Sequence, residues 1–251
     1  MGAIVAVANQ KGGVAKTTTV HSLGAALAER GRRVLLVDLD PQACLTYAVG
    51  ADPDDLGITI HDVMVGRAKA DEAIIDVGDL RVLPSSIDLA GAEIHLLTKT
   101  GREFVLRRAL RPVVGDYDLA FVDCGPSLGI LTINGLTAAT HVLVPFQAET
   151  LSHRGVGQLL ETIADVRAYT NEDLRVVGAV ATMFDARTRL SRQVLEDVEQ
   201  IHGLDVLEPP IPRSVRVAEA PGRGRSVLDH ARHSKPAEAY RELAATIEAR
   251  L

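Results

Sequence analysis

The stretch that most constrains this chain is Ala3 to Thr19, AIVAVANQKGGVAKTTT. It begins with apolar and β-branched residues typical of a buried strand, and good helix formers follow it from Ser22 to Glu29. The turn between them contains Gly12 and Gly13, which have no side chain to keep a bound anion away from the backbone N–H groups. A strand, a glycine turn and a helix in this order predict a phosphate-binding loop.

Two side chains after the glycines have the chemistry of a triphosphate site. Lys16 supplies a mobile positive charge for β- and γ-phosphate oxygens, and the Thr17 hydroxyl is placed to ligate Mg²⁺. The strict pattern G-x-x-x-x-G-K-[ST] is not met, because Gln10 and Ala15 stand where it has glycines. The methyl group of Ala15 would crowd a closely bound phosphate, and it would be strained if φ is positive.

A second lysine, Lys11, precedes the two glycines and gives the pattern K-G-G-x-x-K-T-T. This arrangement resembles the deviant loop of the ParA and MinD superfamily of ATPases. The resemblance implies that Lys11 reaches across a dimer interface to the partner's nucleotide, so that Lys11 and Lys16 are both catalytic. It also implies nucleotide contacts along the whole loop, from Lys11, Gly12, Gly13, Val14, Ala15, Lys16, Thr17 and Thr18.

Two further apolar runs end in aspartates. Arg33 to Leu39 leads into Asp40, and Tyr117 to Val122 leads into Asp123. Carboxylates at the C-terminal ends of parallel strands lie where an open α/β sheet binds its ligands, so Asp40 and Asp123 are expected to join Thr17 in holding Mg²⁺ or a water. The run VLLVDLDPQ resembles the ParA/Soj branch of the superfamily, in which the residue matching Asp40 orients or activates the attacking water.

The turn after Asp123, Cys124 to Gly129, is rich in helix breakers and is expected to move with the γ-phosphate as a switch loop does. The family usually has two prolines after the cysteine, so Gly125 departs from its pattern and should make the turn more flexible.

The resemblance also suggests contacts from more distant parts of the chain. It places Asn134 near the nucleotide, and it draws the adenine-side contacts from Asp185, Pro212 and Arg213. Residues 84–97, PSSIDLAGAEIHLL, predict a helix whose Ile87, Leu89, Ile94 and Leu97 are expected in the core.

The segment from Pro209 to Arg225 is basic, although the formal net charge of the chain is -6. Arginines that neutralise phosphates give sequence-independent, salt-dependent binding to DNA. Because only 3% of the residues are aromatic, stacking on single strands is disfavoured and the duplex backbone is the expected target. The DNA-binding candidates in this segment are Arg216, Arg223 and Arg225, and the alternative is a solvated loop with scattered charge. The resemblance supports Arg216 and adds one of Arg187 or Arg189 from the loop after the M-x-D residues.

The resemblance covers essentially the whole chain. It implies an α/β, three-layer P-loop NTPase fold, a mainly parallel twisted sheet with helices on both faces. We expect residues 1–251 to form a single ATPase domain of this type. No run approaches the roughly 18–20 apolar residues of a membrane span, and Met1 leads directly into the first strand, so we expect a cytoplasmic protein without a signal peptide.

Other functions fit less well. A MinD-like membrane ATPase needs a terminal helix with large apolar residues opposite a basic face, whereas residues 242–251, ELAATIEARL, are small and alanine-rich. An iron-protein reductase would place its cluster cysteine further along than Cys124, and a tyrosine autokinase usually has a C-terminal tyrosine cluster, whereas Tyr240 stands alone in this tail. An ATP-gated scaffold with little turnover remains an alternative because of Ala15.

The function expected from the resemblance is therefore a partition ATPase. It would bind ATP and Mg²⁺, close as an ATP-dependent homodimer and bind double-stranded DNA non-specifically on the nucleoid. Slow hydrolysis, stimulated by a ParB-like protein, would release it, and no membrane would take part. The cargo, a chromosome, a plasmid or another assembly, is left open.

Overall fold

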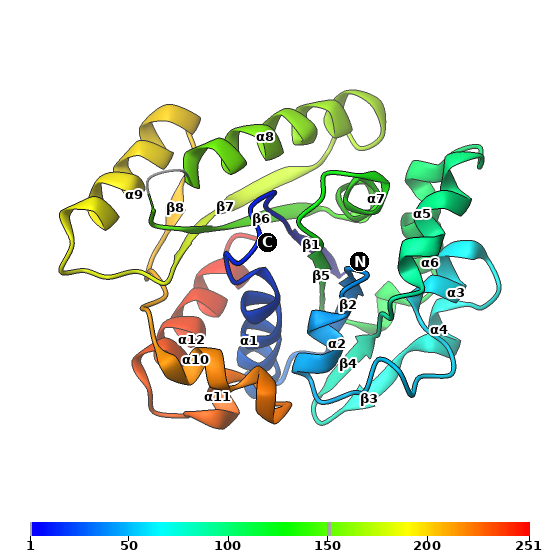
Figure 1. Ribbon diagram of the computed structural model, residues 1–251, viewed down its shortest axis with the longest axis horizontal. Helices are drawn as coiled ribbons and strands as arrows, with labels where there is room; N and C mark the ends of the chain where they lie inside the picture. Colours follow the sequence, from blue (N-terminus) through cyan, green and yellow to red (C-terminus); the bar gives the residue numbers. More distant parts are fainter. Residues whose placement is uncertain (1, 150–151) are drawn as a thin grey trace.

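The computed structural model describes residues 2–149 and 152–251, and these residues contain one eight-stranded sheet (Figure 1). The strands follow apolar runs that suit burial on both faces. Their bounds are β1 Ala3–Val7, β2 Val34–Leu39, β3 Ile75–Val77, β4 Leu80–Leu83, β5 Leu119–Cys124, β6 His141–Gln147, β7 Arg175–Thr182 and β8 Val206–Leu207.

The strand order is β3-β4-β2-β5-β1-β6-β7-β8, and every neighbouring pair is parallel except β3 with β4. The predicted mainly parallel sheet is thus confirmed. The phosphate-loop strand β1 lies between β5 and β6, and β2 lies beyond β5. Because parallel strands end at the same edge, the segments that follow β1, β2 and β5 meet there.

Helices cover both faces of the sheet, as expected (Figure 1). The helical bounds are α1 Lys16–Glu29, α2 Cys44–Ala48, α3 Ile60–Val65, α4 Ala70–Ala73, α5 Leu89–Leu97, α6 Val105–Leu110, α7 Ile130–Ala138, α8 Ser152–Tyr169, α9 Arg189–His202, α10 Val215–Glu219, α11 Val227–His230 and α12 Lys235–Glu248. Short 3₁₀ turns span Arg102–Phe104, Val114–Asp116 and Pro221–Arg223.

The core has two layers, one on each face of the sheet. Alternate residues of β1 enter them: Ile4 and Ala6 pack with α5 to α9, whereas Val5 and Val7 pack with α1, α11 and α12. Tyr240 of α12 is fully buried in the second layer, as its helical stripe predicts. No helix of the described residues is both long enough and apolar enough to cross a bilayer.

One expectation for the core is wrong. Leu89 is buried, but Ile87, Ile94 and Leu97 are 63%, 72% and 61% exposed. Helix α5 turns a narrow stripe of Leu89, Ala92 and Leu96 inward, and the predicted stripe was too wide for a helix with a single packed face.

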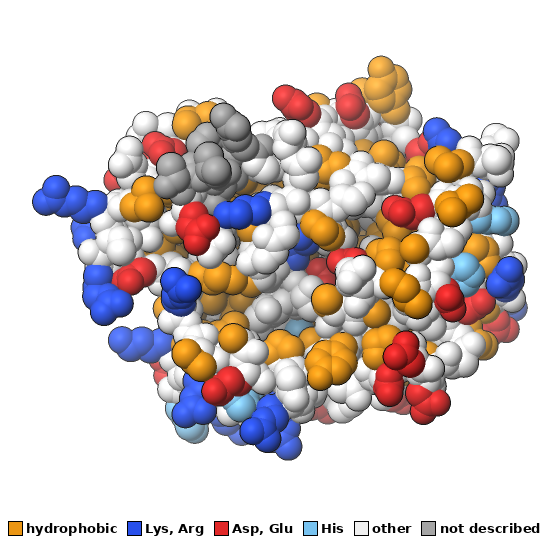
Figure 2. All heavy atoms as spheres, in the orientation of Figure 1, with side chains coloured by type: hydrophobic (Ala, Val, Ile, Leu, Met, Phe, Trp, Pro, Cys, Tyr) orange, Lys and Arg blue, Asp and Glu red, His pale blue; other side chains and the backbone are white. Residues whose placement is uncertain are grey.

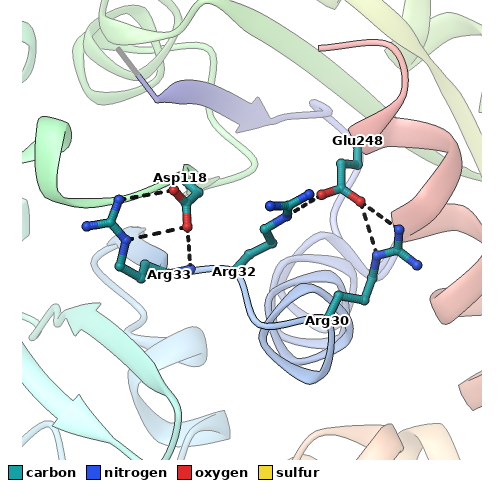
Figure 3. A network of polar contacts seen from close by, with 5 residues as sticks. All are labelled: Arg30, Arg32, Arg33, Asp118 and Glu248. Atoms are coloured by element: carbon teal, nitrogen blue, oxygen red, sulfur yellow. Dashed lines mark hydrogen bonds and ion pairs between the residues drawn. The ribbon is translucent and has the colours of Figure 1, made fainter.

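Ion pairs join several elements where the parallel strands begin, at the opposite end of the strands from the phosphate loop (Figure 3). Arg30 and Arg32, which follow α1, both donate to Glu248 near the end of α12. Arg33, before β2, pairs with Asp118, before β5, at 3.1 Å. The contacts with Glu248 tie α12 to the end of α1, and the contact between Arg33 and Asp118 ties the start of β2 to the start of β5.

Candidate nucleotide-binding site

The phosphate loop connects β1 to α1. The space beside Gly12 and Gly13 is open, since no atom lies within 4 Å of a Cβ built at either position. Ala15 precedes α1 with φ 63° and ψ 34°, in the left-handed region that only glycine adopts without strain. Ala15 therefore has the positive φ at which its methyl group is expected to be strained. Val14 is buried and its carbonyl accepts a hydrogen bond from the Thr182 hydroxyl at 3.1 Å, so only its backbone N–H remains for a ligand.

Lys16 begins α1 and its side chain is largely buried. Its Nζ donates to the carbonyl of Lys11 at 3.4 Å. Burial lowers the pKa of Lys16, while the negative charge of Asp123 acts in the opposite direction. A buried ammonium with one long hydrogen bond has donors left for phosphate oxygens.

Asp123 lies near the end of β5 and is fully buried. Neither of its carboxylate oxygens accepts a hydrogen bond from any described residue, although the nearby Thr17 hydroxyl favours its charged form. Burial raises the pKa of Asp123 well above its usual range, and the charge of Asp38 raises it further. Two unpaired buried oxygens are a costly arrangement for the protein alone, and they fit a divalent cation.

Within the described residues, no group of three or more His, Cys, Asp and Glu side chains is arranged to hold a metal. Mg²⁺ is usually held by one or two protein ligands together with nucleotide phosphates and waters. Thr17 and Asp123 are the residues suited to such a site.

Asp38, which shares the end of β2 with Asp40, is a functional candidate to which the sequence alone assigned no role of its own. It is the register partner of Asp123 on the neighbouring strand β2. Its carboxylate accepts hydrogen bonds from the Thr46 hydroxyl at 2.7 Å, the Thr46 amide at 2.8 Å and the Asp40 amide at 3.2 Å. Asp38 thereby fixes the turn that carries Asp40. The sequence Asp38-Leu39-Asp40 shows two carboxylates at the end of a strand. That Asp38 lies beside Asp123, however, depends on the register between β2 and β5.

Asp40 follows β2 and lines the cavity. Its Oδ1 accepts a hydrogen bond from the Gln42 amide at 3.0 Å. Gly125, in the turn after β5, lies beside this carboxylate, and a Cβ built there would lie 3.3 Å from Asp40 Cγ. The departure from the family pattern at Gly125 is therefore in contact with the residue expected to position water.

Lys16, Thr17 and Asp40 line a cavity of about 1060 Å³. Of the expected nucleotide contacts, Gly12, Gly13, Ala15, Lys16, Thr17, Thr18, Pro212 and Arg213 line it. Pro212 and Arg213 are brought there by the segment after β7, because Phe184 forms a bridge with Pro212 and accepts a hydrogen bond from the Arg213 amide at 3.1 Å. Lining residues that the sequence did not suggest include Cys44, Tyr47, Ile87, Met183 and Val217.

Two expected contacts lie elsewhere. Asn134 is fully buried, donates to the carbonyls of Arg102 and Ile130 and accepts from the amide of Leu106, so its amide group joins α7 to the neighbouring segment. Asp185 is paired with Arg187 by two 3.0 Å contacts instead of lining the cavity. Neither side chain reaches the nucleotide site in this conformation.

Lys11 stands at the start of the loop. Its Nζ lies 3.2 Å from Glu149 Oε2, just after β6. Lys11 is not among the described residues that line the cavity, and its ammonium group is paired with Glu149 instead.

The candidate DNA-binding arginines form two groups, one at the start of α9 and one around α10 and α11. Figure 2 shows Lys and Arg side chains gathered over both regions on the face that carries the cavity. The first group contains Arg187 and Arg189; the second contains Arg216, Arg223 and Arg225. Arg216 is partly neutralised, because it lies 3.3 Å from Glu219.

The chain is similar to known ATPases over nearly its whole length. Residues 2–176 match the AAA domain family. The chain is 45% identical to the sporulation initiation inhibitor protein Soj of Bacillus subtilis, covering 99% of each, and 41% identical to the chromosome partitioning protein ParA of Myxococcus xanthus, covering 96% of this chain and 86% of that one.

Solved structures agree with this similarity. Cobyrinic acid a,c-diamide synthase of Mycobacterium smegmatis, with bound ADP and magnesium, is 53% identical with a TM-score of 0.88, over 98% of this chain and 93% of that one. The same protein has been solved with an ATP analogue and magnesium. The cell division ATPase MinD of Pyrococcus furiosus is 26% identical with a TM-score of 0.81, over 99% of both chains.

Proposed function

Because this chain belongs to the ParA/Soj family of ATPases, we propose that it acts in chromosome or plasmid partition as an ATP-dependent dimer on DNA. It is an ATPase that uses ATP and Mg²⁺. We propose further that residues 1–251 work as one ATPase domain. The 53% identical structure carries the name of a different activity. Partition is favoured because curated relatives named Soj or ParA match this chain over nearly its full length.

The observation that carries the catalytic proposal is the pair of buried Asp123 oxygens beside Lys16, which accept no hydrogen bond from the residues that the structure describes. Lys16 and the loop N–H groups would hold the triphosphate, and Thr17 with Asp123 would hold Mg²⁺, which neutralises phosphate charge when bound. Asp40, at the cavity wall, would position water for in-line attack and could also reach the metal's water shell. Lys11 of a second copy would offset charge that develops at the γ-phosphate.

DNA binding would follow dimerisation. Each subunit offers two arginine groups beside the cavity, and a rigid dimer would present four of them to one duplex. Two linked surfaces bind with a higher effective concentration than either alone. The nucleotide would thereby control where the protein resides, on the nucleoid or free in the cytoplasm, and a ParB-like partner would reset the cycle by speeding hydrolysis.

The decisive experiment replaces Lys11 by Ala and measures the molar mass by light scattering with a non-hydrolysable ATP analogue and Mg²⁺. We expect the wild type to dimerise and Lys11→Ala to stay monomeric while it still binds the analogue. Lys99→Ala, a lysine remote from the cavity lining, serves as the matched control and should dimerise. A Lys11→Ala variant that dimerises and hydrolyses ATP like the wild type would remove the basis for the cross-subunit role.

A further inference from the structure

We propose that Glu149 is a positioning residue that holds Lys11 on its own subunit and releases it when two subunits close on ATP. The inference rests on the proposed cross-subunit role of Lys11. It is carried by the 3.2 Å contact between Lys11 Nζ and Glu149 Oε2, which joins the phosphate loop to the segment after β6.

The backbone of Lys11 is anchored, so only its side chain is free to move. Its amide donates to Asn9 Oδ1 at 2.9 Å, and the buried Asn9 amide donates to the carbonyl of Pro145 in β6 at 2.8 Å. Helix α8 closes over the same point, because a Cβ at Gly155 would lie 2.9 Å from Asn9 Oδ1 and 3.5 Å from Lys11 Cβ. The position of the Lys11 ammonium group is therefore set by its side-chain torsions and by its ion-pair partner.

The ion pair is weak enough to open. The side chains of Lys11 and Glu149 are 32% and 55% exposed, so water competes for both charges. One exposed ion pair of this kind changes an equilibrium constant by about 1.4- to 5-fold. A triphosphate, with more negative charge than one carboxylate, would outcompete Glu149 for the ammonium group.

In the closed dimer, Lys11 would exchange the carboxylate of Glu149 for phosphate oxygens bound to the other subunit. Two such pairs open for each dimer formed. Glu149 would therefore set a threshold: it would disfavour closure of subunits without ATP and raise the protein concentration at which ATP-bound subunits close.

The test is Glu149→Gln, which keeps the size of the side chain and removes its charge. We expect the dissociation constant of the dimer, measured by light scattering or sedimentation with Mg²⁺ and a non-hydrolysable ATP analogue, to fall about 2- to 25-fold, the square of the effect of one pair. Glu149→Asp, which keeps the charge, should lie nearer the wild type. High salt should reduce the difference between Glu149→Gln and wild type, because it screens exposed charges.

Asp76→Asn is the matched control, since it removes another exposed ion pair, at 2.7 Å from Arg81, on the far edge of the sheet. It should dimerise like the wild type. Unchanged or weaker dimerisation of Glu149→Gln would overturn the assignment. The outcome is separable from the proposed function: if Lys11→Ala stays monomeric while Glu149→Gln behaves as the wild type, only the role of Glu149 is wrong.

Discussion

Asp38 and Asp123 are register partners on adjacent strands, and both carboxyl groups are fully buried with opposite hydrogen-bonding states. Asp38 accepts three hydrogen bonds, from Thr46 and the Asp40 amide, whereas Asp123 accepts none from the described part of the chain. Burial raises the pKa of Asp38 to about 6 and raises the pKa of Asp123 well above its usual range. Without a cation, two adjacent charges are therefore disfavoured, and Mg²⁺ would replace the retained proton.

We expect Asp38→Asn to remove a pH dependence of stability. The folded-state pKa of Asp38, about 6, is above the ordinary aspartate pKa of 3.8. The stabilisation that Asp38 contributes to the folded state is therefore fully present below pH 3.8 and is lost as the pH rises through 6. Between pH 5 and pH 7.5 the free energy of unfolding should fall by about 1 kcal/mol more in the wild type than in Asp38→Asn. Urea unfolding without Mg²⁺ or nucleotide measures this, and identical pH responses of the two proteins would contradict it.

Because the backbone at Ala15 is left-handed, we expect a smaller residue there to leave the stability of the fold nearly unchanged and a β-branched residue to lower it. Ala15→Gly should change the free energy of unfolding by less than about 1 kcal/mol, because relief of about 1–2 kcal/mol is opposed by greater freedom of the unfolded chain. Ala15→Val should lose more than about 1 kcal/mol, since a β-branched residue is poorly accommodated at φ 63°. Urea unfolding decides this, and a Val variant as stable as the wild type would show that the loop relaxes.

Most of the fold could be predicted from the sequence because buried strands and the phosphate loop have strong local signals. The apolar runs Arg33–Leu39 and Tyr117–Val122 correspond to β2 and β5, and the expected carboxylate, Asp123, lies near the end of β5. The strands β3 and β8 were missed because, at three and two residues, they carry too little pattern. Helix α9 was also missed, although its Leu190, Val194, Val198 and Ile201 recur at the spacing of an amphipathic helix.

The site was less predictable where it depends on packing between distant segments. The loop residues Lys16 and Thr17 could be found by local spacing. The hydrogen bonds of Asn134 could not be predicted, because its partners come from a 3₁₀ turn and a helix that precede it by about 30 residues. In the same way, the contact of Gly125 with Asp40 arises only when the ends of β2 and β5 are brought together.

The two arginines at the start of α9 should contribute unequally to DNA binding. Arg187 is held by Asp185, whereas Arg189 is exposed and forms no ion pair with any described residue. Arg189→Gln should therefore weaken duplex binding and reduce the salt slope by about 1, and Arg187→Gln should have the smaller effect. Binding to a duplex of random sequence at several salt concentrations, with ATP analogue, measures both. A larger loss for Arg187→Gln would mean that its pair with Asp185 opens on DNA.

Gly125 should control the freedom of the Asp40 carboxylate. A methyl group at position 125 would lie 3.3 Å from Asp40 Cγ and 3.4 Å from Oδ1, which is closer than ordinary packing. Gly125→Ala should therefore displace or immobilise this carboxylate and lower kcat about threefold or more, since small misplacements of a group that positions water are costly. Affinity for an ATP analogue should stay within about twofold, because Lys16 and the loop glycines are untouched.

Single-turnover hydrolysis and equilibrium binding of the analogue separate these two effects. Gly115→Ala, in a turn where a new Cβ would meet no atom within 4 Å, is the matched control and should hydrolyse ATP at the wild-type rate. If Gly125→Ala matches the wild type in kcat, the turn after β5 must yield by a few tenths of an ångström without moving Asp40. The glycine would then have no part in setting the rate.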